Sequence, residues 1–244
     1  MPYIGLGLII GSRYLSSSTN DLRKKGPRTP VAPDVSDYLK QVIVGLMLGD
    51  LHAERTSING NTRLRVHISA IHKAYGYHLY HIFSLYVKTA PKEIIRKLNP
   101  LTQQSSSSFV FSTLKYAQFN WVFSDFYVKQ KESNGFIKIV PLNIYESLTA
   151  IGLAFWIMVD GSYNKIKGNI ILCTDSYTLQ EIQLLISVLS NKFHLSCGLI
   201  NYKINSKGDL TYRIRINKSS VPTLIELVKP HFIDSMLYKL GLES

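Results

Sequence analysis

Two apolar stretches of the chain each end in a single aspartate, and this repeated feature constrains the fold more than any other. Val44-Gly-Leu-Met-Leu-Gly-Asp50 is the first stretch, and Leu153-Ala-Phe-Trp-Ile-Met-Val-Asp160-Gly161 is the second. The surrounding segments, residues 38–48 and 145–159, place apolar residues at helical spacing with few charges and no proline. The sequence therefore predicts two apolar helices that each carry an acid at the C-terminal end.

An aspartate at this end of a helix opposes the helix dipole, at a cost of roughly 0.3–1 kcal/mol. A single apolar helix that ends in an acid can arise by chance. Here the arrangement occurs twice, at Asp50 and Asp160, and similar patterns follow both copies. The repetition favours a functional role for the two carboxylates.

The order of elements after the two aspartates predicts a duplicated α+β fold. After each acid we expect alternating strands and helices, and equivalent strands lie about a hundred residues apart in the chain. Thr178 and Glu181 form a capping-box sequence that opens a helix through about Phe193. We expect two pseudo-twofold-related αββαββα modules, each with a saddle-shaped antiparallel sheet and helices on one face. The predicted strands are residues 62–69, 105–112, 169–174, 195–203 and 211–217; the further predicted helices are 70–87, 116–128, 178–193 and 221–228, with helical character between 91 and 100.

The domain prediction follows from this repeat. The first module covers residues 36–135 and the second covers residues 136–244. Residues 1–35 contain a serine-rich stretch, a basic cluster and several prolines, so we predict an N-terminal extension that is flexible.

The charge balance predicts a polyanionic partner. The 244-residue chain has 28 Lys and Arg against 16 Asp and Glu, which gives a formal net charge of +12. Its two cysteines, Cys173 and Cys197, do not form the sequence pattern of a zinc site and indicate a reduced, intracellular setting. No apolar run is long enough to cross a bilayer, so we expect no membrane partner.

Two of the predicted strands place basic and polar residues on one face and apolar residues on the other. One alternating strand of this kind is normal on a solvated sheet face, but two in equivalent places of a basic chain favour DNA. A two-stranded ribbon fits the major groove, where Arg can pair with guanine and Asn with adenine. The predicted DNA-binding residues are Arg63, Arg65, His67, Ser69, Ser108, Ser112, Asn201, Lys203, Arg213, Arg215 and Asn217.

The two apolar stretches resemble the signature of the LAGLIDADG homing endonucleases. Ile43-Val-Gly-Leu-Met-Leu-Gly-Asp50-Leu51 and Leu153-Ala-Phe-Trp-Ile-Met-Val-Asp160-Gly161 align with that signature without gaps, and both keep its last Asp. The chain departs from the signature at Leu51, where the final Gly is usual, and at Phe155 and Val159, where small residues are usual. The resemblance covers residues 37–240.

This resemblance implies a monomeric enzyme that cuts both DNA strands at a long asymmetric site and leaves 3′ overhangs. Two helices that meet about a twofold axis would bring Asp50 and Asp160 side by side, and a divalent cation would remove their mutual repulsion. We expect Mg²⁺, with Mn²⁺ as a substitute, and backbone carbonyls at Gly49 and Val159 as further metal ligands. Lys138 and Lys239 occupy contexts like those of the active-site lysines in double-motif members of the family. The usual setting of such genes, group I introns of organelles, implies a mitochondrial location.

Two other functions remain open from the sequence. An RNA maturase that assists splicing of its host intron would use the same basic scaffold without needing the acid pair. A DNA-binding module of the same fold would bind tightly and cut nothing. Retention of both Asp50 and Asp160 favours cleavage.

Overall fold

The two apolar helices are present, and their bounds follow from the residues at their ends. The computed structural model of the chain describes residues 33–57, 59–95, 105–130, 135–206 and 208–243. Helix α1 spans Asp37–Leu48 and is capped by Ser36, whose hydroxyl accepts a hydrogen bond from the amide of Leu39. Helix α5 spans Ala150–Asp160 and is capped in the same way by Thr149. Apart from residues 33–35, the predicted extension lies outside the described residues.

Each helix opens a set of elements in the same order, which confirms the α+β fold. The first set, after α1, contains β1 (His52–Glu54), β2 (Arg63–Ser69), α2 (Lys73–Ile82), β3 (Lys92–Ile95), β4 (Ser107–Ser112) and α3 (Asn120–Phe126). The second set, after α5, contains β7 (Gly161–Asn164), β8 (Asn169–Leu172), α6 (Leu179–Phe193), β9 (Cys197–Ile204), β10 (Leu210–Ile216) and α7 (Val221–Val228). The hairpin β5–β6 (Tyr127–Lys129 and Phe136–Lys138) and the short helix α4 (Ile144–Ser147) stand between the two sets.

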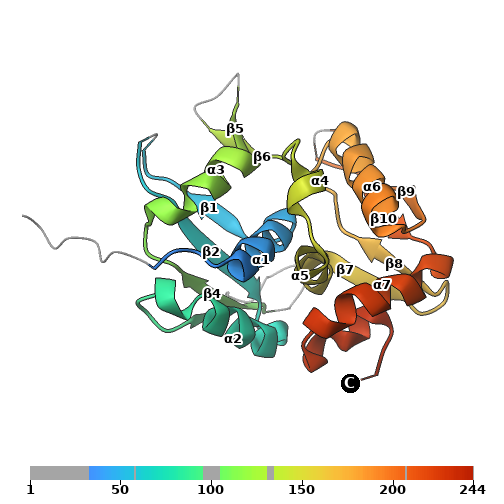
Figure 1. Cartoon of the computed structure of the whole chain (residues 1–244), viewed down its shortest axis with the longest axis horizontal. Helices are drawn as coiled ribbons and strands as arrows, with labels where there is room; N and C mark the ends of the chain where they lie inside the picture. The colour runs from blue at the N-terminus through green and yellow to red at the C-terminus, as the bar shows by residue number, and fades with distance from the viewer. Residues whose placement is uncertain (1–32, 58, 96–104, 131–134, 207, 244) are drawn as a thin grey trace, which may run out of the picture. The chain divides into compact units, whose positions relative to one another are not determined.

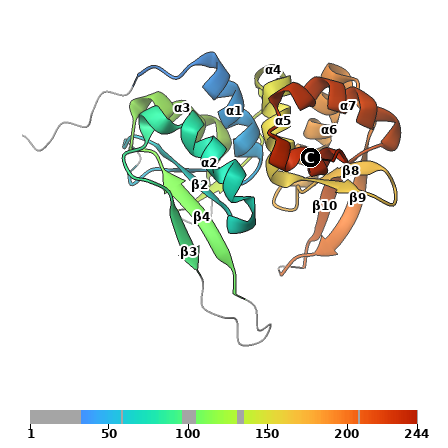
Figure 2. The ribbon, with the colours of Figure 1, turned by 90° about the horizontal axis from the view of Figure 1, so that it is seen from below.

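The two four-stranded sheets share one topology. Their strand orders are β1-β2-β4-β3 and β7-β8-β10-β9, with antiparallel pairing throughout. In each sheet the alternating apolar side chains are buried beneath helices, as at Val66 on β2 and Ile214 on β10. Helices α1 and α5 lie side by side between the sheets, as both views show (Figures 1 and 2).

Three sequence predictions of local structure were wrong. The segment 145–159 is not one helix, because the chain is extended at Leu148 and Thr149, so that α4 ends and α5 begins from its own cap. The helical character expected between residues 91 and 100 gives way to strand β3 at Lys92–Ile95, where pairing with β4 decides the conformation; the rest of that segment lies outside the described residues. The segment 70–87 is divided among 3₁₀ turns and the shorter helix α2.

Other predictions were confirmed closely. Helix α6 begins after Thr178 with both hydrogen bonds of the capping box and ends at Phe193. Strands β2, β4 and β10 fall within one or two residues of the predicted bounds. No helix in the described ranges has the length and apolar character that a bilayer span requires.

Candidate active site and nucleic-acid interface

The contact between α1 and α5 is closest where two glycines meet. A Cβ atom built on Gly45 would lie 2.0 Å from the carbonyl oxygen of Gly152, far inside ordinary contact distance. Gly152 lies about one helical turn before Phe155, which occupies a motif position where a small residue is usual. The small residue that lets the two helices approach is therefore Gly152, outside that position. Phe155 is buried elsewhere, with its ring stacked 6.0 Å from that of His78 on α2. The helix pair therefore tolerates the unusual Phe155 without losing its close packing.

This packing brings the ends of the two helices together. A Cβ atom on Gly49 would lie 3.1 Å from Oδ2 of Asp160, so the Asp160 carboxylate sits against the residue before Asp50. Asp50 is exposed and Asp160 is half-buried. Burial first, and then the charge of Asp50, raise the pKa of Asp160 to about 7. The two acids therefore share one electrostatic environment, as the sequence predicted.

Two lysines lie beside the acids: the half-buried Lys138, on the hairpin between the two sets of elements, and the buried Lys239, near the C-terminal end of the second set. Lys138 on β6 donates from Nζ to the carbonyl oxygens of Gly49 (2.5 Å) and Leu51 (3.2 Å). Lys239, in the 3₁₀ turn Asp234–Leu240, donates from Nζ to the carbonyl oxygen of Val159 (2.7 Å). Each ammonium thus satisfies backbone oxygens at the negative end of a motif helix.

The lysines remain close enough to the acids to feel both charges. Burial lowers the pKa of Lys138 and of Lys239 to about 8, while the charges of Asp160 and Asp50 oppose the shift. Each ammonium can balance negative charge that develops near the carboxylates.

The donor set fits a hard divalent cation. Asp50 and Asp160 offer carboxylate oxygens from two directions, and oxygen is the donor that Mg²⁺ prefers. The carbonyls of Gly49 and Val159 already accept lysine hydrogen bonds, which leaves one lone pair on each for another partner. Within the described part of the chain, no group of three or more His, Cys, Asp or Glu side chains could hold a metal ion. A cation here would rest on the two acids and on oxygens from outside the protein.

A cavity of about 200 Å³ opens next to Asp50 on the side of the first sheet. Polar groups of Ser69 and His72 line it together with apolar groups of Met158 and Val159. The space exceeds what one water molecule requires, and the polar lining can hold water close to the acid.

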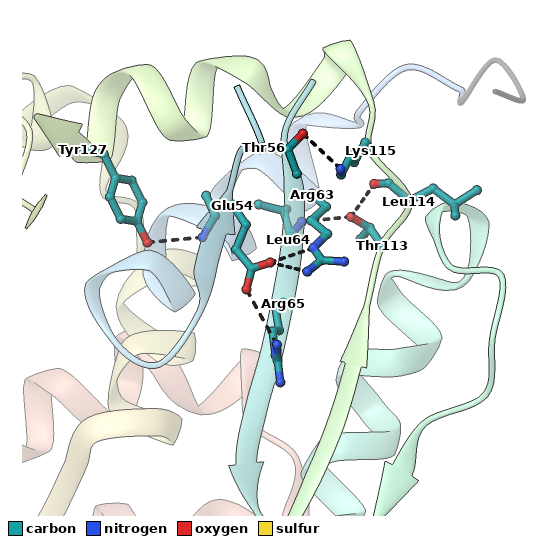
Figure 3. Close-up of polar contacts among 10 residues, drawn as sticks. Glu54, Thr56, Arg63, Leu64, Arg65, Thr113, Leu114, Lys115 and Tyr127 are labelled. Carbon is teal, nitrogen blue, oxygen red and sulfur yellow. Dashed lines mark hydrogen bonds and ion pairs between the residues drawn. The ribbon is translucent and has the colours of Figure 1, made fainter. Parts of the chain in front are cut away.

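The first sheet carries its predicted polar residues on one face. Register pairs Arg65 with Ser112 and Ser69 with Ser108, so these side chains project from the same side, together with Arg63 and His67. Figure 3 shows that Glu54 on β1 joins this face and contacts both arginines. Its Oε2 accepts from Nε of Arg63 at 2.7 Å, and its Oε1 lies 3.8 Å from Arg65.

The second sheet carries only part of its predicted set on one face. Arg213, Arg215 and Asn217 alternate with buried residues of β10, and Arg215 donates to the side-chain oxygen of Asn217 at 2.9 Å. Asn201 pairs with Tyr212 rather than with Arg213, so it projects from the opposite face. Lys203 pairs with Thr211, and its Nζ lies 5.2 Å from the centre of the Tyr202 ring, which Arg213 also covers. A register shift between Thr211 and Tyr212 separates these pairs. Asn201 therefore does not share the face of Arg213, whereas the ammonium of Lys203 lies near the same aromatic ring as the Arg213 guanidinium.

Comparison with known proteins decides the family. The sequence profile of the LAGLIDADG DNA endonuclease family matches residues 40–224, most of the chain. The chain belongs to this LAGLIDADG family.

Relatives of this LAGLIDADG protein include endonucleases and maturases. It is 35% identical to the intron-encoded endonuclease ai4 of Dictyostelium discoideum over 55% of this chain and 78% of that protein. It is 29% identical to the cytochrome b mRNA maturase bI2 of Saccharomyces cerevisiae over 91% of its own length. The match spans about half of the yeast protein, 51%.

A solved structure supports the same fold. The homing endonuclease I-WcaI, whose structure was determined bound to its DNA recognition sequence, superposes with a TM-score of 0.74. The match covers 92% of this chain and 97% of that one at 24% sequence identity. At this identity the likeness concerns the fold of the LAGLIDADG protein rather than its activity.

Sequence reasoning missed three residues around the site of this LAGLIDADG protein. Glu54 and Asp175 each neutralise an arginine of the predicted DNA-binding faces. Tyr177 donates its hydroxyl to the carbonyl oxygen of Leu48 at 3.0 Å and so ties the second half to the end of α1. A local signal exists for Glu54, an acid that precedes an arginine-rich strand by a hairpin turn. For Asp175 and Tyr177 the contacts depend on tertiary packing.

Proposed function

We propose that this protein is a site-specific endonuclease of double-stranded DNA that depends on a divalent metal and uses one acid for each strand. The observation that carries the proposal is the meeting of Asp50 and Asp160 at the ends of α1 and α5, beside the ammonium groups of Lys138 and Lys239. Intron-encoded endonucleases among the relatives support it.

The residues of the site divide the work of phosphodiester hydrolysis. Mg²⁺, or Mn²⁺ in its place, would activate a water molecule and stabilise the leaving 3′-oxygen when bound. Asp50 and Asp160 would hold the cation from both halves, with one acid serving each strand. The family resemblance implies that the cut leaves 3′ overhangs. Lys138 and Lys239 would offset negative charge at the phosphate, from positions fixed by their carbonyl hydrogen bonds.

The two sheets would provide recognition of a long asymmetric site. Their polar faces carry different residues, Arg63, Arg65 and His67 on one and Arg213 and Arg215 on the other, so the half-sites they select would differ. A net charge of +12 favours association with the DNA backbone. The structure of I-WcaI, a protein of the same fold bound to its DNA recognition sequence, supports DNA as the partner. We propose a monomer, because one chain carries both acids.

The decisive experiment uses a plasmid that carries the intron-free junction at which the gene's host intron inserts. The wild-type protein should linearise the plasmid with Mg²⁺ or Mn²⁺ and leave it intact with EDTA. Asp50→Asn and Asp160→Asn should each abolish linearisation, and any residual nicks should fall on opposite strands. Tight binding of the junction without cutting in any metal would replace the proposal with that of a DNA-binding module.

An RNA maturase is the second candidate, because the match with the yeast cytochrome b mRNA maturase extends over 91% of this chain. In this function the basic scaffold would bind the host intron RNA and stabilise its folded form. Addition of Asp50→Asn protein to the intron transcript distinguishes the two, since splicing assistance would persist without the acid whereas DNA cleavage would not. Under either function we propose that the protein works in the mitochondrion, where its host transcript would be found.

A further inference from the structure

The guanidinium of Arg213 is fixed more firmly than any other arginine on the two predicted DNA-binding faces. Its Nε donates to Oδ1 of Asp175 at 2.7 Å, and its Nη2 donates to Oδ2 at 2.9 Å. Its Cζ atom lies 3.3 Å from the centre of the Tyr202 ring. A two-pronged ion pair and a stacked aromatic ring together restrict both the plane and the direction of the side chain.

The other arginines of these faces are held more loosely. Arg63 and Arg65 share the single carboxylate of Glu54, and their side chains are 40% and 38% exposed. Arg215 is held by the neutral amide of Asn217. The Arg213 side chain is 21% exposed, and only this arginine combines a two-pronged carboxylate contact with a ring across its face among the residues that the structure describes.

The contacts of Arg213 leave one edge of the guanidinium for a partner from outside. Asp175 uses the edge formed by Nε and Nη2. Nη1, with the second hydrogen of Nη2, forms the other edge, and among the described residues no acceptor is hydrogen-bonded to it. Two parallel donors of this kind match O6 and N7 of guanine in the major groove. Because Asp175 cancels the charge of Arg213, the side chain is better suited to directional pairing with a base than to phosphate attraction.

We propose that Asp175 is a positioning residue that orients Arg213, against Tyr202, to select one guanine in the DNA half-site read by the second sheet. The inference rests on the proposed function, since it assumes that the sheet faces duplex DNA. Beyond that function, the inference specifies the base, guanine, and assigns Asp175 a role that it exerts through Arg213 without touching the DNA. Preorganisation is the reason for its effect, because Arg213 need not lose rotamer freedom when it binds.

A purely structural ion pair is the competing explanation. Asp175 lies in the turn after β8, and Arg213 lies on the neighbouring strand β10, so the pair could simply fasten that turn. The two explanations differ in what removal of the Asp175 charge does to DNA. A loosened turn would weaken binding of all sequences. A lost positioning residue would remove one base preference and, with one negative charge fewer, strengthen binding to unrelated sequences.

The test is selection of bound duplexes from a randomised DNA pool by the full chain in the presence of Ca²⁺. The wild-type protein should enrich guanine about tenfold or more at one position, as expected for a good two-pronged contact. Asp175→Asn should lose enrichment at that position alone, keep the other preferences, and bind a scrambled duplex more tightly than wild type. Arg213→Lys, which keeps a positive charge opposite Asp175 but removes the planar fork, should lose the same position.

Glu54→Gln is the matched control, because it removes a carboxylate beside arginines of the first sheet and should leave this guanine preference unchanged. If Asp175→Asn fails to fold, Arg213→Lys alone decides whether the preference depends on the guanidinium. Unchanged guanine enrichment in Asp175→Asn, unchanged enrichment in Arg213→Lys, or weaker binding of Asp175→Asn to every duplex would each overturn the inference. If the wild-type protein selects a defined site but never cuts it, the proposed cleavage function is wrong and this inference is unaffected. Absence of any selected site would sink both.

Discussion

Replacement of Gly45 by alanine tests whether the contact between the two motif helices is as close as the structure requires. The new Cβ atom would lie 2.0 Å from the carbonyl oxygen of Gly152, 2.7 Å from its carbonyl carbon and 2.9 Å from its Cα. All three atoms are backbone, so a side-chain rotation cannot relieve the clash. Ordinary contact begins near 3.4 Å, which means that α1 and α5 must separate by more than 1 Å at this point.

The expected cost follows from two opposing effects. Overpacking of a well-packed core costs about 1–3 kcal/mol, and a backbone clash between two buried helices belongs at the upper end. Alanine returns about 1 kcal/mol through its higher helix propensity, since Gly45 lies inside α1. We therefore expect Gly45→Ala to lower the free energy of unfolding by about 2 kcal/mol, and to slow DNA cleavage further by moving Asp50 away from Asp160.

Gly152→Ala is the matched control on the facing helix. Its Cβ atom would lie 3.1 Å from the carbonyl oxygen of Gln41 and 3.1 Å from Cδ1 of Leu148, which a shift of a few tenths of an ångström relieves. This variant should stay within about 1 kcal/mol of wild type, because the small clash and the gain in helix propensity nearly offset each other. Urea unfolding followed by circular dichroism measures both variants. Equal stability of the two would refute the close helix contact and the placement of the acids that depends on it.

Three further predictions address the polar groups of the site. Because the pKa of Asp160 is raised to about 7, binding of Mn²⁺ must displace a proton below that pH, so the affinity measured by electron paramagnetic resonance should fall roughly tenfold per pH unit from 7 towards 5. Lys239→Met should slow cleavage of bound DNA by about 10²-fold or more while changing the dissociation constant for DNA by only a few fold. Tyr177→Phe removes the hydrogen bond to the Leu48 carbonyl and should lower the free energy of unfolding by about 1–2 kcal/mol in the same urea assay.

Several parts of the fold could be predicted because local and tertiary preferences agree there. The alternation in β2 places Leu64, Val66 and Ile68 in the core and its basic residues outside, and no long-range information is needed to see it. Helix α6 has a capping box at one end and an apolar stripe that faces β10, so its bounds were evident. The repeat of the acid-ended helices then fixed the topology of both halves.

Other features depend on pairing between distant segments, which residue patterns do not encode. Asn201 lies on the strand next to β10, yet the register places Ile200 rather than Asn201 opposite Arg213, and the residue pattern does not reveal this one-residue difference. Strand β3 has a composition that also suits a helix, and only β4 beside it selects the strand. The break before α5 is similar, since the Thr149 cap competes with an uninterrupted apolar pattern.

The electrostatics of the site explain why an acid pair can persist at the ends of two helices. Both helix dipoles direct negative potential towards Asp50 and Asp160. Lys138 and Lys239 relieve the helix ends by donating to carbonyl oxygens, and burial at the same time brings the pKa of each ammonium down to about 8. The pKa of Asp160 is raised to about 7, so the pKa values of this acid and of the two lysines all lie close to neutral pH. A divalent cation between the acids would shift this balance towards the ionised carboxylates and add positive charge facing the phosphate backbone. Under the proposed function, the arrangement that makes the acid pair costly in the protein alone would favour the simultaneous presence of metal and DNA.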